Sequence, residues 1–282
     1  MSNRAIVTKL LTAAAAAATG LFALAANADL DKLLNYYQIG DHAMGSQIRL
    51  HEKPLAGTNG LGKIVPDATT LATSTVPGMD VSRYQGNVAW STAYANGARF
   101  AYVKATENIN YVSPYFAQQY NGSYNVGMIR GAYHFAIPSA SSGATQANYF
   151  VDHGGGWSAD GKTLPGALDI EYNPYGASCY GLSQTAMVNW INDFSNRYFQ
   201  RTGRYPVIYT STSWWSTCTG NKGNFSSTSP LWVARYASTV GTLPYPWGVY
   251  TFWQFSDSGT FPGDQDIFNG TLSRLQVLAR GS

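Results

Sequence analysis

The chain has 282 residues, of which only 12% are charged, and its formal net charge is +3. A charge this small gives no electrostatic reason to expect a nucleic acid or an anionic membrane surface as the partner. Aromatic residues make up 14% of the chain, with 20 Tyr and 8 Trp. Because sugar rings stack on aromatic faces and accept neutral hydrogen bonds, this composition suits a glycan partner, although it also suits other secreted β-rich domains.

The first 28 residues have the order of a secretory signal peptide. Arg4 and Lys9 precede an apolar run rich in Ala and Leu, and the small residues 26–28 supply a cleavage site. A membrane anchor is the alternative, but the run is short and alanine-rich for a span, and no later stretch is long and apolar enough to cross a bilayer. We therefore expect a secreted, extracellular protein whose mature net charge is about +1, since only these two basic residues are lost.

Residues 29–76 are interpreted as an N-terminal extension, either a linker or a pro-segment. The stretch has few large apolar residues, ends in the Ala- and Thr-rich run 68–75 and is too short to bury a core of its own. One short helix over 33–39 is the only element that we predict in it.

From residue 77 to 282, strand-like and helix-like segments alternate. The eight predicted strands cover 78–82, 99–106, 129–137, 167–172, 206–210, 231–236, 250–255 and 265–268. Predicted helices lie between the early strands, at 89–96, 115–124, 145–152 and 184–201, and become rare after the fifth strand. This pattern predicts an α/β fold, namely one irregular TIM-like β/α barrel with eight strands. A doubly wound open sheet is the alternative, but no glycine-rich nucleotide motif follows any strand.

Two acids stand two positions apart on the predicted strand 167–172. Because side chains alternate along a strand, Asp169 and Glu171 share one face, and the opposite face is apolar. Two carboxylates held together and partly out of water do not both ionise easily, so one keeps its proton near neutral pH. This is what a general acid beside an ionised partner requires. Two solvated acids at the end of a strand are the simpler alternative.

In barrels of this kind the active site lies at the carboxyl ends of the strands. Residues at these ends are therefore further candidates for the site. Asp80 and Asp266 are predicted to bring two more acids there, although each alone would commonly be a turn or cap residue. Lys104 either projects among the acids or runs past the core, and His134 is expected to be structural. The neutral candidates for binding a sugar, about half of which we expect to be simple core, are Tyr133, Tyr209, Trp232, Tyr236 and Gln254.

The chain has two cysteines, Cys179 and Cys218. In an oxidising compartment we expect them to pair and to stabilise the fold by ~3–4 kcal/mol through loop entropy. The sequence has no C-x-x-C or H-E-x-x-H motif, so no metal site is predicted.

Short motifs in order along residues 77–280 resemble those of the Chalaropsis-type lysozymes, family 25 of the glycoside hydrolases. The matching segments are GMDVS at 78–82, QG at 85–86, YVKATE at 102–107, GAYHF at 131–135, LDIE at 168–171, LWVA at 231–234 and WQF at 253–255, followed by Asp266. The resemblance implies a modified β/α barrel that cleaves the β-1,4 bond after N-acetylmuramic acid in bacterial cell-wall peptidoglycan. It also implies that Glu171 is the general acid and Asp169 its partner, with Asp80 and Asp266 completing an acidic floor.

The resemblance implies no metal or organic cofactor, and we expect a monomer. Asp169 can serve as the nucleophile, activate a water, or orient the acetamido group of the sugar so that this group attacks. The spacing of the two acids favours the third route, because it leaves little room for a water between them. A non-catalytic secreted glycan-binding protein on the same barrel is the alternative function, and the presence of Glu171 argues against it. An esterase or protease would need a nucleophile motif such as G-x-S-x-G or a Cys/His pair, and we find neither.

Overall fold

The structure is a computed structural model that describes residues 41–52, 66 and 74–281. The predicted signal peptide, residues 1–28, and the predicted helix over 33–39 lie outside these residues, so both stay predictions. The domain boundary at residue 77 also stays a prediction. Within the described part of the chain, no helix is long and apolar enough to cross a membrane.

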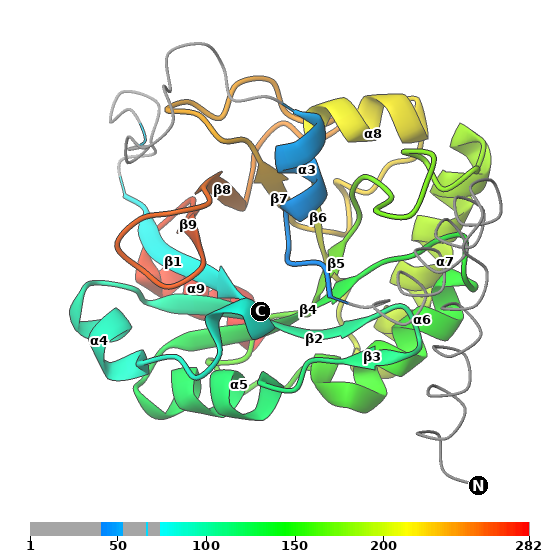
Figure 1. Ribbon diagram of the computed structural model, residues 1–282. Coiled ribbons are helices and arrows are strands. Elements are labelled where there is room, and N and C mark those ends of the chain that lie inside the picture. Colours follow the sequence, from blue (N-terminus) through cyan, green and yellow to red (C-terminus); the bar gives the residue numbers. More distant parts are fainter. Residues whose placement is uncertain (1–40, 53–65, 67–73, 282) are drawn as a thin grey trace, which may run out of the picture. The chain divides into compact units, whose positions relative to one another are not determined.

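A closed ring of eight strands organises the described residues (Figure 1). Each strand is hydrogen-bonded to the next, and the pairing of β1 with β2 closes the ring. The eight strands are β1 (Val76–Val81), β2 (Phe100–Glu107), β4 (Ile129–Phe135), β5 (Ala167–Asp169), β6 (Val207–Thr210), β7 (Leu231–Ala234), β8 (Phe252–Ser256) and β9 (Asp264–Phe268). A short strand, β3 (Tyr111–Val112), pairs with β2 outside the ring. The predicted eight-stranded barrel is confirmed.

The last strand of the barrel runs against the others. The seven strands from β1 to β8 in the ring pair in parallel, whereas β9 is antiparallel to both of its neighbours. Its amino end therefore lies where the other strands have their carboxyl ends. Asp264 is paired with Asp80, and Asp266 lies deeper, opposite Gly78. The sequence predicted Asp266 at the mouth of the barrel; because of the strand direction, Asp264 takes that place.

Helices cover the first part of the barrel and become rare later, as predicted. They are α3 (Ser46–His51), α4 (Trp90–Ala95), α5 (Phe116–Asn125), α6 (Gly143–Phe150), α7 (Gln184–Thr202), α8 (Thr212–Thr219) and α9 (Leu272–Arg280), with single turns at Arg83–Gln85 and Val151–Gly155. The long helix α7 begins at Ser183, whose side chain accepts a hydrogen bond from the N–H of Ala186. It ends at Gly203, whose φ of 74° favours glycine. The short helices α3, α8 and α9 were not predicted.

Apolar side chains fill both sides of the barrel wall. Outside, Ile191 and Phe194 of α7 pack in one cluster with Leu168 and Ile208 of the strands. Inside, the main filling consists of aromatic residues, namely Phe100, Tyr102, Tyr133, Tyr209, Trp232, Phe252 and Phe268. Leu275 of α9 belongs to this inner cluster with residues from the beginnings of strands, so α9 closes the amino end. The interior is therefore a packed core, and a site can form only at the carboxyl end.

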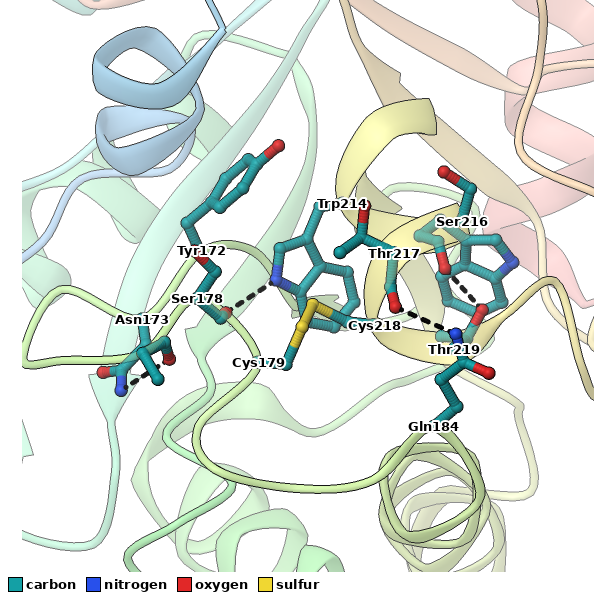
Figure 2. Close-up of a disulfide and its surroundings, with 12 residues drawn as sticks. Tyr172, Asn173, Ser178, Cys179, Gln184, Trp214, Ser216, Thr217, Cys218 and Thr219 are labelled. Carbon is teal, nitrogen blue, oxygen red and sulfur yellow. Dashed lines mark hydrogen bonds between the residues drawn. A yellow bond between two sulfur atoms is a disulfide. The ribbon is translucent and has the colours of Figure 1, made fainter.

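The predicted disulfide between Cys179 and Cys218 is confirmed, with the two Cα atoms 5.2 Å apart (Figure 2). Cys179 lies in the loop that follows Glu171, and Cys218 lies on α8. Next to the bond, Nε1 of Trp214 donates to the carbonyl of Ser178 at 3.1 Å. The disulfide therefore ties the loop after the candidate acid to the helix after β6.

Candidate active site

Asp169 is the last residue of β5, and Glu171 follows two positions later, so the strand is shorter than predicted. Both carboxyl groups are fully buried. Burial raises the pKa of Asp169 well above its usual range, and the negative charge of Glu171 raises it further. Burial also raises the pKa of Glu171 to about 8, although backbone N–H donors and the charge of Arg49 oppose this shift. The pair therefore holds a proton at neutral pH, as a general acid and its partner require.

Asp169 is a buried acid without local hydrogen bonds. Neither of its carboxyl oxygens has a hydrogen-bond partner among the described residues. Buried polar atoms normally have such a partner, so these oxygens are available to a ligand. In Asp266 only one carboxyl oxygen lacks a hydrogen-bond partner. Its Oδ1 accepts from Nε1 of Trp232 at 3.0 Å, whereas its Oδ2 has no partner in the described part of the chain.

Gln254 connects the aspartates of the mouth with the aromatic lining. Its Nε2 donates to Oδ2 of Asp80 at 2.7 Å and to Oδ2 of Asp264 at 3.0 Å. Its Oε1 accepts from the hydroxyls of Tyr209 and Tyr236, both at 2.6 Å. A flipped amide would turn its carbonyl oxygen toward two carboxylates, so this network fixes the orientation of the side chain.

Lys104 projects toward the mouth and does not run past the core. Its Nζ donates to Oε2 of Glu107 at 2.6 Å, and both side chains are fully buried. Burial alone would raise the pKa of Glu107, but the charge of Lys104 and the hydrogen bond from His42 lower it to about 2. The charge of Lys104 also lowers the pKa of Asp169, against the larger effect of burial.

All ten candidate site residues are buried, and four of them belong to the inner aromatic cluster, namely Tyr133, Tyr209, Trp232 and Tyr236. The ten are Asp80, Lys104, Tyr133, Asp169, Glu171, Tyr209, Trp232, Tyr236, Gln254 and Asp266. His134 is separate from them. Its Nδ1 lies 2.8 Å from Oγ1 of Thr106 and its Nε2 lies 2.9 Å from Oε1 of Gln146, as expected for a structural histidine.

The sequence did not predict that residues 41–52 reach the site. This segment, which includes α3, lies over the carboxyl ends of the strands beside β6 and β7 (Figure 1, blue). The N–H of Gly45 donates to Oε1 of Glu171 at 2.7 Å. The N–H groups of Gln47 and Ile48 donate to Oε2 at 3.1 and 2.8 Å.

Within the described residues, no group of three or more His, Cys, Asp or Glu side chains is placed to hold a metal ion.

Comparisons with known proteins identify the family of this chain. The family model of the glycosyl hydrolases family 25 matches residues 79–264. The chain is similar to lysozyme M1 of Streptomyces globisporus, with 48% identity over 251 residues, which cover 86% of this chain and 83% of that protein. It is also similar to the N,O-diacetylmuramidase of a Chalaropsis species, with 50% identity over 211 residues, covering 73% of this chain and all of that protein. The solved structure of a muramidase from Acremonium alcalophilum has a TM-score of 0.72 and 60% identity, covering 73% of this chain and all of that one.

Proposed function

This chain belongs to the glycosyl hydrolases family 25, and from that premise we propose that it cleaves the β-1,4 bond between N-acetylmuramic acid and N-acetylglucosamine in bacterial peptidoglycan. It is a glycoside hydrolase of the lysozyme and muramidase class. The observation that carries the finer proposal is the buried pair of Asp169 and Glu171 at the end of β5. Hydrolysis of a glycosidic bond needs two such carboxyl groups, one of them protonated.

Glu171 is the general acid of the proposed reaction. Burial raises the pKa of Glu171 and so favours its protonated form, and this proton passes to the glycosidic oxygen as the bond to the leaving sugar breaks. The resulting carboxylate then takes a proton from the incoming water, as microscopic reversibility requires.

Asp169 assists at the other side of the bond. Its two oxygens without a partner are free to accept the N–H of a sugar acetamido group, which would turn the acetamido oxygen toward the anomeric carbon. The short spacing between the two acids favours this route over an attacking water held between them. A nucleophilic Asp169 is the competing mechanism.

The remaining acids and the neutral lining hold the substrate. Asp80 and Asp266 form an acidic floor of the cleft, and burial raises the pKa of both groups well above the usual range. Tyr133, Lys104 and Gln254 supply polar groups for the sugar. Three aromatic side chains supply further contacts, namely Tyr209, Trp232 and Tyr236.

The protein is proposed to act outside the cell as a monomer. The pattern of residues 1–28 is that of a signal peptide, and the bond between Cys179 and Cys218 is typical of proteins in an oxidising compartment. A secreted enzyme can reach the cell wall of bacteria from outside the cell.

Loss of turbidity in a suspension of bacterial cell walls tests the activity, and the new reducing end tests the bond. We expect new reducing ends on N-acetylmuramic acid, detected by mass spectrometry after borohydride reduction. Reducing ends on N-acetylglucosamine would contradict the proposed bond. Binding to the walls without any new reducing end would favour the alternative, a non-catalytic glycan-binding protein.

A further inference from the structure

We propose that residues 41–52 are an intramolecular inhibitor, which sits across the carboxyl end of the barrel and must leave before a glycan can enter. The inference rests on the proposed function, because the groups that the segment covers are those assigned there to the substrate. It identifies the occupant of the cleft as a part of the same chain.

The backbone of the segment forms hydrogen bonds to Glu171. The hydrogen bonds that this carboxyl group accepts within the described residues come from three backbone N–H groups, those of Gly45, Gln47 and Ile48. Both carboxyl oxygens are engaged, one by the first N–H and the other by the second and third. A general acid must come within hydrogen-bond reach of the oxygen that it protonates. A glycosidic oxygen cannot reach Glu171 while these N–H groups surround it.

Gly45 stands at the tightest point of the contact. Its φ of 74° lies in the left-handed region that favours glycine. A Cβ atom at this position would overlap the hydroxyl of Tyr236 and would lie 2.6 Å from both Oε1 of Gln254 and Oη of Tyr209. The segment therefore fits closely against three of the groups that we assign to the substrate, and it fits only with glycine at this position.

Two apolar side chains anchor the segment in the mouth. Met44 and Ile48 are 0% and 1% exposed, and both belong to the inner aromatic cluster of the barrel. The backbone N–H of Met44 also donates to the hydroxyl of Tyr133 at 3.2 Å. Because the burial of apolar surface is favourable, these side chains favour the seated state. They occupy the apolar surface that a sugar ring would need.

Polar contacts to two acids hold the segment on both sides of Glu171. On one side, Nη1 of Arg49 donates to Oδ2 of Asp264 at 2.9 Å. On the other side, the backbone N–H and Nδ1 of His42 lie 2.9 and 2.8 Å from the carboxyl oxygens of Glu107. The segment is therefore bound to the barrel on both sides of the residues that contact Glu171.

The family model does not include this segment. The N,O-diacetylmuramidase from Chalaropsis aligns over its full length with only 73% of this chain. The family match in this chain begins at residue 79, after the segment. Residues 41–52 fall within the match to lysozyme M1, which covers 86% of this chain, so that relative shares the segment, whereas the Chalaropsis enzyme is matched in full by a smaller part of the chain. A segment that lies outside the family match and yet covers the general acid suits a role in control and not in the reaction.

An inhibitor of this kind has a distinct kinetic signature. It competes with the glycan for the same groups, so the apparent KM is raised by the inverse of the fraction of molecules whose cleft is open. The rate at saturating substrate is unchanged, because every molecule then has the segment displaced. Since the segment is part of the chain, its effective concentration is high, on the order of millimolar, and dilution does not relieve it.

Full-length variants that cannot seat the segment test the proposal. Gly45→Val adds atoms where none fit, and Met44→Asp places a charge in the aromatic cluster. Both positions lie outside the strands of the barrel. Leu50→Ala is the matched control, because Leu50 lies on α3 and is 75% exposed. The initial rate of wall lysis is measured against wall concentration. We expect an apparent KM at least about 10-fold lower in the two seating variants, an unchanged maximal rate, and wild-type behaviour in the control.

The outcomes separate this inference from the proposed function. Equal apparent KM values in active wild type and both seating variants would overturn the inhibitor and leave the enzyme standing. If no form of the protein lyses walls, the proposed function fails, and amide hydrogen exchange decides the occlusion. Slow exchange at Gly45, Gln47 and Ile48 that becomes fast in Met44→Asp supports it, whereas fast exchange in the wild type overturns it.

Discussion

Asp80 and Asp264 stand opposite each other on the antiparallel strands β1 and β9, and the side-chain amide of Gln254 donates a hydrogen bond to each carboxyl group. Burial raises the pKa of Asp80 well above its usual range, and the negative charges of Asp264 and Asp266 raise it further. The amide lies between two buried acids and donates a hydrogen bond to each of them. Removal of the amide should therefore lower the free energy of unfolding and change the pKa of both acids.

Gln254→Met tests this role of the amide. Methionine has a similar volume but offers no hydrogen bonds, so two carboxyl groups and two tyrosine hydroxyls lose a partner. We expect the free energy of unfolding to fall by about 2–4 kcal/mol, as for a broken buried network. Gln200→Met, on the exposed side of α7, is the control and should change it by no more than about 0.5 kcal/mol. Equal effects in urea unfolding of the two variants would exclude Gln254 as the centre of the network.

Glu171→Gln removes the proton of the proposed acid and almost no volume. We expect wall lysis to fall by several orders of magnitude, since general acid catalysis alone supplies ~10²–10⁴-fold. The rates are measured in the wild-type chain and in the Gly45→Val chain, so that occupation of the cleft does not hide the loss. Thermal unfolding checks that the fold is intact. A variant that keeps more than about a tenth of the activity would remove Glu171 from the mechanism.

His134 should make the stability of the protein depend on pH. Burial lowers the pKa of His134 to about 4 from its usual 6.5, so the folded protein holds the neutral imidazole while the unfolded chain takes up a proton. The contribution is complete above pH 6.5 and is lost as the pH falls toward 4. It amounts to at most about 3 kcal/mol. Glu171 acts in the opposite direction, because its raised pKa favours the folded state at acid pH and this contribution is lost as the pH rises through about 8.

The comparison of wild type with His134→Asn isolates the histidine. Urea unfolding at pH 7 and at pH 4.5 gives the free energy of each protein, and the change between the two pH values is compared. We expect a larger fall on acidification in the wild type than in the variant, since the carboxyl groups contribute equally to both. The same fall in both proteins would contradict the assignment.

The sequence predicts the barrel and its acid pair because both depend on local pattern. Asp169 and Glu171 are two positions apart, so the alternation of a strand is enough to bring them together. Asp264 was missed for a different reason. The direction of the last strand is decided by its neighbours in space, and hydrophobic alternation is the same for parallel and antiparallel strands.

The seating of residues 41–52 had no signal in the sequence. Gly45 and Glu171 are 126 positions apart, and the contact is made by backbone N–H groups, which every residue except proline carries. Six helical residues are also too few for a periodic pattern to be read. Gly45 follows Met44 directly, and a glycine after an apolar residue is common in loops. Only the folded barrel shows what this glycine fits.

The last prediction concerns Asp169 and decides between its two mechanisms. If Asp169 orients the acetamido group, Asp169→Asn should lose most of the activity, and a thiazoline that mimics the cyclised intermediate should inhibit the wild type and bind the variant more weakly. Asp193→Asn, an exposed acid on α7, is the control and should leave both properties unchanged. Rates and inhibition are measured in the Gly45→Val chain, where the cleft is open.

Added azide distinguishes the competing mechanism. If Asp169 is the nucleophile, its replacement by alanine leaves a cavity that azide can occupy. Azide then attacks the face of the sugar that the aspartate attacked, and the product is a glycosyl azide of inverted configuration. An orienting aspartate gives no such rescue, because the nucleophile is the substrate's own acetamido oxygen. The two oxygens of Asp169 that have no partner among the described residues are available acceptors for the acetamido N–H, so we expect no azide product from Asp169→Ala. An inverted glycosyl azide, together with no inhibition by the thiazoline, would make Asp169 the nucleophile.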